Sequence, residues 1–291
     1  MIKTTAFTTH WFDLPLGRIS VRTAGAGRPL FFTHGLLVDG RIWDDVAVAV
    51  AAEHYTVVLP DLPLGAHTSA VTDRSTLTTA AVADCLFDIA DRLDVDRFAV
   101  LGFDTGGAVA QVATAARPER IERLALMSCD AFEHFPPPMI RPFQWAARWP
   151  PAMRLVLESL SGPRWQHWPL PLGLVAKHRI DPALIAAWSE PPLTNPEIRA
   201  DCVAFIEQMT SADTLAAAER LRHFDGPSMV MWSRQDRIFP RKDAHRLAEL
   251  LPGCELRWID DAYTFASLDN PARMIELILE FLALPARQRF S

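Results

Sequence analysis

The stretch Leu101-Gly102-Phe103-Asp104-Thr105-Gly106-Gly107 lies between a short apolar run and a segment with a helical pattern. A turn this tight between a strand and a helix accepts only small residues two positions before and after its central residue, and Gly102 and Gly106 occupy those positions. Asp104 is therefore predicted to project from the turn, where the unpaired N–H groups and the dipole of the helix N-terminus favour an ionised carboxylate. The simpler alternative is an aspartate that only caps the helix.

Strand and helix patterns alternate on both sides of this turn. The predicted strands are 11–14, 19–23, 30–32, 55–59, 98–102, 121–127, 228–232 and 255–259. The predicted helices are 39–53, 76–93, 106–116, 242–251 and 271–282. Alternation at this spacing is typical of an α/β fold with a mostly parallel, doubly wound central sheet and flanking helices.

The alternation stops near residue 131 and returns after residue 221. Residues 133–221 contain no convincing buried strand, but they are rich in proline and hold tryptophans such as Trp145. We therefore expect a core formed by 1–132 and 222–291, and a helical cap formed by 133–221. The cap is expected to lie over the C-terminal edge of the sheet, where open α/β sheets bind their ligands.

The bulk properties exclude several classes of partner. The net charge is −6 and no Lys/Arg cluster stands out, so nucleic acid is not an expected partner. No run approaches the about 18 apolar residues of a membrane helix, and the N-terminus lacks a signal-peptide pattern. The four cysteines are scattered, which favours free thiols in a cytoplasmic protein over disulfides or a metal site. No motif for a metal or nucleotide cofactor is found, and a homodimer is left open.

The elbow around Asp104, set between a strand and a helix and followed by an inserted cap, resembles the α/β-hydrolase superfamily over essentially the whole chain. The chain is most similar to the cap-bearing members with an aspartate nucleophile, the haloalkane dehalogenase and epoxide hydrolase relatives. Residues 61–67, 104–107 and 128–132 also resemble a subgroup of bacterial proteins described only as α/β hydrolases. The resemblance implies an α/β-hydrolase fold with an inserted α-helical cap.

One segment can be matched to the superfamily's oxyanion hole. Thr33-His34-Gly35-Leu36 resembles the family's His-Gly segment. The match implies that the backbone N–H groups of Leu36 and Thr105 face the negative charge that develops in a transition state. His34 itself is expected to brace this loop rather than to transfer protons.

The superfamily's acid and histidine positions can also be matched, and one of them departs from the pattern. Asp236 matches the usual triad acid, whereas Asp130 matches the position where some relatives keep that acid, or is simply a helix cap. In the segment 260–271 the register of the aromatic, acidic and proline residues puts Thr264 where the catalytic histidine normally stands. The last histidine of the chain is His245, on a charged helix face.

A threonine hydroxyl is too weakly basic near neutral pH to activate water against an ester. Either another base replaces the histidine, with His134, His167 and His178 of the cap as candidates, or Asp104 does not form an ester. The features typical of the two named relatives are also missing, because Thr105 follows the nucleophile position instead of tryptophan and the cap holds no tyrosine.

The sequence favours an enzyme, and by family default a hydrolase, that acts on a small, largely apolar organic molecule. Its predicted catalytic residues are Asp104, Asp236 and Thr264. The candidate substrate-binding residues are His34, Phe103, Asp130 and Trp145. Two alternatives remain open. One is a cofactor-free lyase, isomerase or cyclase with Asp104 as general base, and the other is a non-catalytic protein that binds a small ligand.

Overall fold

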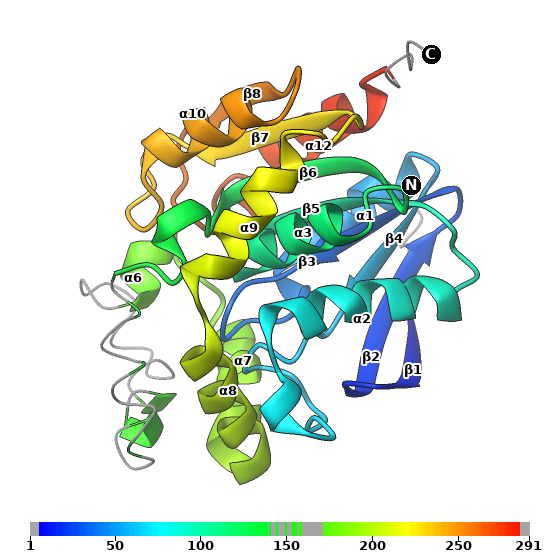
Figure 1. Cartoon of the computed structure of the whole chain (residues 1–291). Coiled ribbons are helices and arrows are strands. Elements are labelled where there is room, and N and C mark those ends of the chain that lie inside the picture. Colours follow the sequence, from blue (N-terminus) through cyan, green and yellow to red (C-terminus); the bar gives the residue numbers. More distant parts are fainter. Residues whose placement is uncertain are drawn as a thin grey trace.

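The computed structural model of the chain describes residues 6–138, 140, 144, 149, 153–155, 157–158 and 171–285. Its centre is an eight-stranded sheet (Figure 1). The strands are β1 (Thr8–Leu14), β2 (Gly17–Gly25), β3 (Arg28–Thr33), β4 (Tyr55–Pro60), β5 (Phe98–Asp104), β6 (Ile121–Cys129), β7 (Ser228–Ser233) and β8 (Glu255–Ile259). Their order in the sheet is β1-β2-β4-β3-β5-β6-β7-β8.

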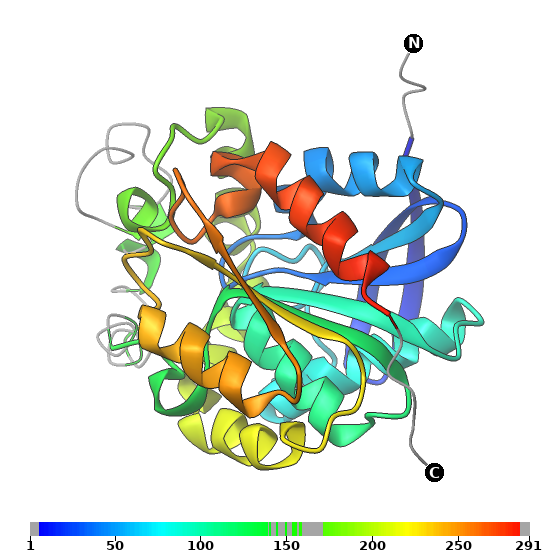
Figure 2. The same cartoon turned by 90° about the horizontal axis from the view of Figure 1, so that it is seen from above.

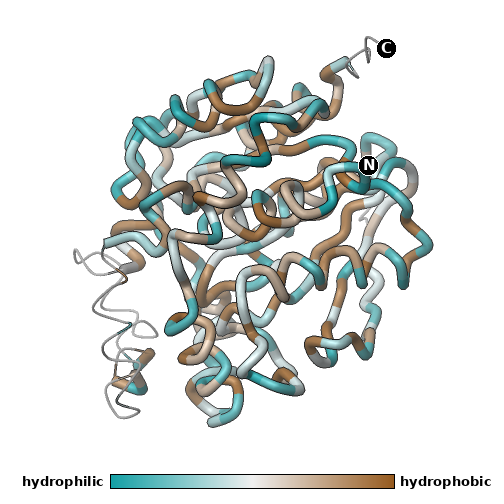
Figure 3. Tube along the Cα trace, in the orientation of Figure 1, coloured by the Kyte–Doolittle hydropathy of each residue, from teal (hydrophilic) through white to brown (hydrophobic). Residues whose placement is uncertain are grey.

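The strands β3 to β8 are mutually parallel, and β2 runs antiparallel to both of its neighbours. The central strands are mostly apolar because helices cover both faces of the sheet, and β7 is entirely buried. Apolar residues accordingly run through the central strands, whereas hydrophilic residues gather in the outer loops (Figure 3). The predicted fold class, a mostly parallel sheet with flanking helices, is confirmed.

Two groups of helices cover the sheet, one on each face (Figure 2). The helices α1 (Asp44–Ala52) and α12 (Pro271–Ala283) pack together on one face. The other face carries α2 (Thr79–Arg92), α3 (Thr105–Ala116), α9 (Ser211–Leu221) and α10 (Arg241–Leu250). The predicted helix 39–53 is in fact divided, because the Asp39 side chain caps a 3-10 turn, Gly40–Trp43, that precedes α1.

Between residues 133 and 221 the described residues form helices and connecting segments. After a short 3-10 turn at Phe132–His134 come α6 (Pro171–Val175), α7 (Pro182–Thr194) and α8 (Pro196–Gln208). The last helix of this range, α9, packs against α3 and therefore belongs to the layer that covers the sheet.

Two further features follow from the composition. Within the described ranges, none of the helices has the length and apolar character needed to cross a bilayer. All four cysteines are free thiols, and three of them are buried. Burial raises the pKa of Cys202 to about 12, so this thiol stays protonated near neutral pH.

Candidate active site

The elbow at Asp104 has the backbone geometry that its glycines imply. Asp104 ends β5 and has φ of 52° and ψ of −134°, a conformation that L-residues rarely adopt. A Cβ atom on Gly102 would lie 2.5 Å from the carbonyl oxygen of Gly106, and one on Gly106 would lie 2.5 Å from that of His34. Only glycine fits at either position, so the sharp turn holds the Asp104 side chain at the C-terminal edge of the sheet.

The Asp104 carboxylate is held by the groups that were expected to form the oxyanion hole. The Thr105 backbone N–H donates to Asp104 Oδ1, and the Thr105 hydroxyl lies 3.1 Å from the same oxygen. The Leu36 backbone N–H also donates to this carboxylate. Burial raises the Asp104 pKa to about 6, although these hydrogen bonds act in the opposite direction. Asp104 is therefore mostly ionised at neutral pH and mostly protonated below about pH 6.

His34 supports the loop that brings Leu36 to this site. Its Nε2 accepts a hydrogen bond of 2.9 Å from the Leu62 backbone N–H, so the neutral ring carries its proton on Nδ1, 3.0 Å from the Gly35 carbonyl oxygen. Burial lowers the His34 pKa to about 4, which keeps the ring neutral. His34 was a candidate substrate-binding residue, but it is not among the residues that line the cavity described below.

Thr264 and Asp236 are brought together by the loops that follow β8 and β7. The Thr264 hydroxyl lies 3.2 Å from both carboxylate oxygens of Asp236. The backbone N–H groups of Ile238 and Phe239 each donate to Asp236 at 2.8 Å, and Ser128 supplies a side-chain hydrogen bond. The Asp236 charge acts on Asp104, so the three residues predicted as catalytic share one region of the sheet edge. Thr264 thus takes the place beside the acid where a histidine was expected.

Asp130 follows β6 and lies beside Thr105. Its Oδ2 is 3.1 Å from the Thr105 hydroxyl, while its Oδ1 is buried without a hydrogen-bond partner among the described residues. Burial and the neighbouring charge of Asp104 raise the Asp130 pKa well above its usual range. The alternative role of helix cap does not apply, because Ala131 precedes the short helix that follows.

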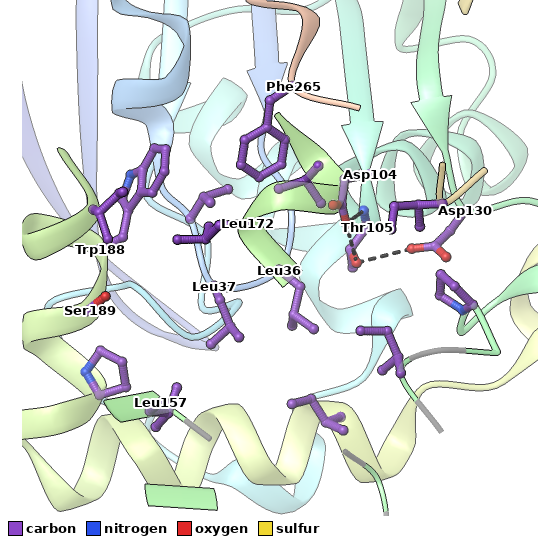
Figure 4. Close-up of a pocket in the computed structure, with 18 of the residues that line it drawn as sticks. Leu36, Leu37, Asp104, Thr105, Asp130, Leu157, Leu172, Trp188, Ser189 and Phe265 are labelled. Atoms are coloured by element: carbon purple, nitrogen blue, oxygen red, sulfur yellow. Dashed lines mark hydrogen bonds between the residues drawn. The ribbon is translucent and has the colours of Figure 1, made fainter. Parts of the chain in front are cut away.

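A largely apolar cavity opens beside these carboxyl groups (Figure 4). Asp104, Thr105 and Asp130 form part of one wall, and Trp188 and Leu157 lie away from them on the other sides. The remaining lining residues are Leu36, Leu37, Val38, Pro137, Ile140, Leu172, Val175, Ile185, Ser189, Pro192, Ile206, Ile238, Phe239 and Phe265. Such a cavity suits a small apolar molecule that is oriented by a few polar groups.

Phe103 and Trp145 were the two other candidate substrate contacts. Phe103 is fully buried between Trp43 and Phe265, with ring centroids 5.2 and 5.7 Å away, and it does not line the cavity. Phe103, which precedes Asp104 on β5, therefore packs in the core of the fold. Trp145 lies outside the described residues.

The candidate replacement histidines have other partners. His134 Nδ1 lies 2.7 Å from Asp243 Oδ2 on α10, and His178 Nε2 lies 3.1 Å from the exposed Asp261. His167 lies outside the described residues. In the part of the chain that the structure covers, no three His, Cys, Asp or Glu side chains are grouped to hold a metal ion.

Trp188 is a site residue that the sequence analysis did not single out. It lies on α7, lines the cavity and donates from its indole N–H to Asp39 at 3.1 Å. Arg41 reaches the same helix and lies 3.2 Å from the Ala187 carbonyl oxygen. The available signal was a tryptophan within a proline-rich helix, which does not reveal a partner about 150 positions earlier in the chain.

Comparisons with known proteins agree with this architecture. A family described as alpha/beta hydrolase fold matches residues 28–271. Haloalkane dehalogenase 2 of Mycobacterium tuberculosis is 25% identical over 292 residues, covering 94% of each chain. The structure of an α/β-hydrolase fold protein from Burkholderia ambifaria gives a TM-score of 0.78 at 23% identity, covering 95% of this chain and 99% of that one.

The structure of the epoxide hydrolase CorEH is similar to the same degree. Its TM-score is 0.79 at 21% identity, and the match covers 96% of this chain and 99% of that one. Likeness at such low identity extends to the fold, and the family match spans most of the sequence. The chain belongs to the α/β-hydrolase fold family.

Proposed function

We propose that this chain is a hydrolase in which Asp104 attacks an electrophilic carbon of a small, largely apolar organic molecule. The attack forms an ester on Asp104, and water then hydrolyses the ester. The apolar lining of the cavity supports this substrate class, since it offers few polar groups apart from Asp104, Thr105 and Asp130.

The observation that carries the proposal is the position of the Asp104 carboxylate among the oxyanion-hole donors. Thr105 donates to Oδ1 from its backbone N–H, which leaves Oδ2 for attack on carbon. Once the ester has formed, Oδ1 is its carbonyl oxygen and already lies beside the N–H groups that stabilise negative charge on it when water adds.

A second candidate is cofactor-free acid–base chemistry, as in a lyase, isomerase or cyclase. The unequal pKa shifts of Asp104 and Asp130 favour it, because such a pair can supply a base and an acid together. We rank it second because the donors that would stabilise a substrate enolate are already engaged by Asp104 itself.

We also propose that α6, α7 and α8 form a cap over the cavity, since Leu172, Ile185 and Ile206 of these helices line it. The packing of α9 against α3 favours ending this cap near residue 210 rather than at 221. The small substrate would then bind between the cap and the sheet edge.

The test is to trap the ester. Protein mixed with 1,2-epoxybutane or 1-bromobutane is quenched in acid within milliseconds to seconds, digested and examined by mass spectrometry. The peptide that contains Asp104 is expected to gain the mass of the reagent, and Asp104→Asn is expected to abolish that gain. Peptides with exposed carboxylates such as Asp13 serve as internal controls for non-specific alkylation. Proton exchange at an acidic C–H without any adduct would instead favour the second candidate.

A further inference from the structure

Two carboxyl groups in the cavity wall share a single hydroxyl group. The Thr105 hydroxyl lies 3.1 Å from Asp104 Oδ1 and 3.1 Å from Asp130 Oδ2. A hydroxyl has one hydrogen to donate, so it cannot donate to two ionised carboxylates at once. One of the two carboxyl groups must therefore carry a proton and donate it to the Thr105 oxygen.

The hydrogen-bond partners identify which group carries that proton. Asp104 accepts from the backbone N–H groups of Thr105 and Leu36, and both bonds favour its ionised form. The Asp130 side chain is fully buried, and the charge that acts on it is the negative charge of Asp104. The proton thus rests on Asp130, which donates to Thr105, which in turn donates to Asp104.

Resting on the proposed function, we propose that Asp130 is the acid–base residue of this site and takes over the proton transfers of the missing histidine. Asp130 lines the cavity, and its Oδ1 has no hydrogen-bond partner among the described residues. In the acid step the Oδ2 proton passes from its hydrogen bond with Thr105 to the substrate oxygen, whereas Oδ1 is the oxygen that can accept a hydrogen bond from water. The arrangement fits electrophiles whose leaving atom is an oxygen, as in a strained cyclic ether, because such an atom needs a proton when its bond to carbon breaks.

The cycle balances without any other reactant than water. In the first step an Asp104 oxygen forms a bond to carbon, the carbon–oxygen bond of the cyclic ether breaks, and the released oxygen takes the Asp130 proton. In the second step water adds to Cγ of the ester and gives one proton to Asp130. The intermediate then expels the product oxygen, which takes the remaining proton of the added water. Asp104 ends ionised and Asp130 ends protonated, as they began.

Asp130 can change from acid to base because the charge on Asp104 changes during the reaction. While Asp104 is ionised, its negative charge favours the protonated form of Asp130. Formation of the ester removes that charge, so the pKa of Asp130 falls during the step that also takes its proton. Asp130 is therefore an acid when an acid is needed and becomes a better proton acceptor only after the ester is present.

The test compares wild-type protein with Asp130→Asn, using two reagents. The asparagine amide still donates to Thr105, so the hydrogen-bond pattern of the resting site is kept. Bromide leaves 1-bromobutane without a proton, so both proteins are expected to form the Asp104 ester from it at similar rates. Hydrolysis of that ester is expected to be at least about 100-fold slower in the variant. With 1,2-epoxybutane, formation of the ester should slow as well.

The same experiment separates the possible failures. An ester that clears equally fast in both proteins, or persists equally in both, overturns the role of Asp130 and leaves Asp104 as the nucleophile. If the variant alone fails to form the ester from 1-bromobutane, Asp130 only supports the structure of the site, which also overturns the inference. If neither protein forms an ester with either reagent, the proposed function itself fails.

A pH profile adds a readout that a structural role would not change. In wild-type protein the rate of ester hydrolysis is expected to rise with pH as Asp130 loses its proton. Asp104, the charged group that acts on Asp130, is neutral in the ester, so its own ionisation does not contribute to this profile. In Asp130→Asn this dependence should vanish. An unchanged profile in the variant would contradict the inference.

Discussion

Replacement of Asp104 by asparagine should stabilise the fold while it abolishes reaction. Burial raises the Asp104 pKa from 3.8 to about 6 in the folded protein. Each pKa unit corresponds to about 1.4 kcal/mol, so keeping this group ionised costs the folded state about 3 kcal/mol. Asparagine has nearly the same shape and carries no charge, so Asp104→Asn removes this cost.

The direction of the Asp104 pKa shift determines how the stability difference between the two proteins depends on pH. Because the folded-state pKa of this carboxyl is raised, the folded state binds its proton more tightly than the unfolded chain does. The stability contributed by this group is therefore complete below about pH 4 and is lost as pH rises through about 6. Asp104→Asn should match wild-type protein near pH 4 and exceed it by up to about 3 kcal/mol above pH 6.

Thermal unfolding at a series of pH values between 4 and 8 measures this difference. At pH 8 the variant should unfold about 6–12 °C higher than wild-type protein, as expected for about 3 kcal/mol in a chain of this size. Asp13→Asn, which removes an exposed carboxylate, is the matched control and should change little at any pH. A variant that is less stable than wild type at pH 8, or a difference that does not vary with pH, would refute the reasoning.

Further predictions concern the groups around the reactive carboxylate. Gly35→Ala would place a Cβ 2.7 Å from Cβ and Cγ of Asp104, so the yield of trapped ester should fall at least about tenfold; an unchanged yield would contradict the close contact. Trp188→Phe loses the indole hydrogen bond to a buried carboxylate and should lower the free energy of unfolding in urea by about 1 kcal/mol, with no change counting against it. Thr264→His places an imidazole beside Asp236, so the ester should be hydrolysed faster; an equal lifetime would show that this position cannot activate water. The rate of ester formation should rise with pH and level off above about 6 as Asp104 ionises, and a flat profile between pH 5 and 7 would refute the assigned pKa.

Much of the fold could be predicted because the apolar runs in the sequence coincide with the buried strands of the sheet. Buried parallel strands read as short apolar runs, and Gly102 and Gly106 mark a turn where a side chain at either position would collide with backbone. The register of the loop before α12 placed Thr264 opposite Asp236, and the structure puts the hydroxyl 3.2 Å from that carboxylate. The start of α1 could not be placed, because it depends on how the Asp39 side chain caps its neighbours.

The parts of the site that sequence reasoning missed depend on contacts between distant segments. The hydroxyl shared by Asp104 and Asp130 exists because the ends of β5 and β6 are neighbours, and no local pattern sets that distance. Phe103 was a candidate substrate contact beside Asp104, but the alternation of side chains along a strand turns it into the core. Trp188 reaches the cavity only because α7 packs near Asp39.

The central claim is that Asp104 attacks carbon and that water then attacks the Asp104 ester. A single turnover in ¹⁸O-water, with protein in excess over 1,2-epoxybutane, tests it most directly, because water then adds to Cγ of Asp104 and not to the substrate. The account predicts that the ¹⁸O label appears in the Asp104 peptide and is absent from the first diol released. Label found in that diol, with none in the Asp104 peptide, would contradict it.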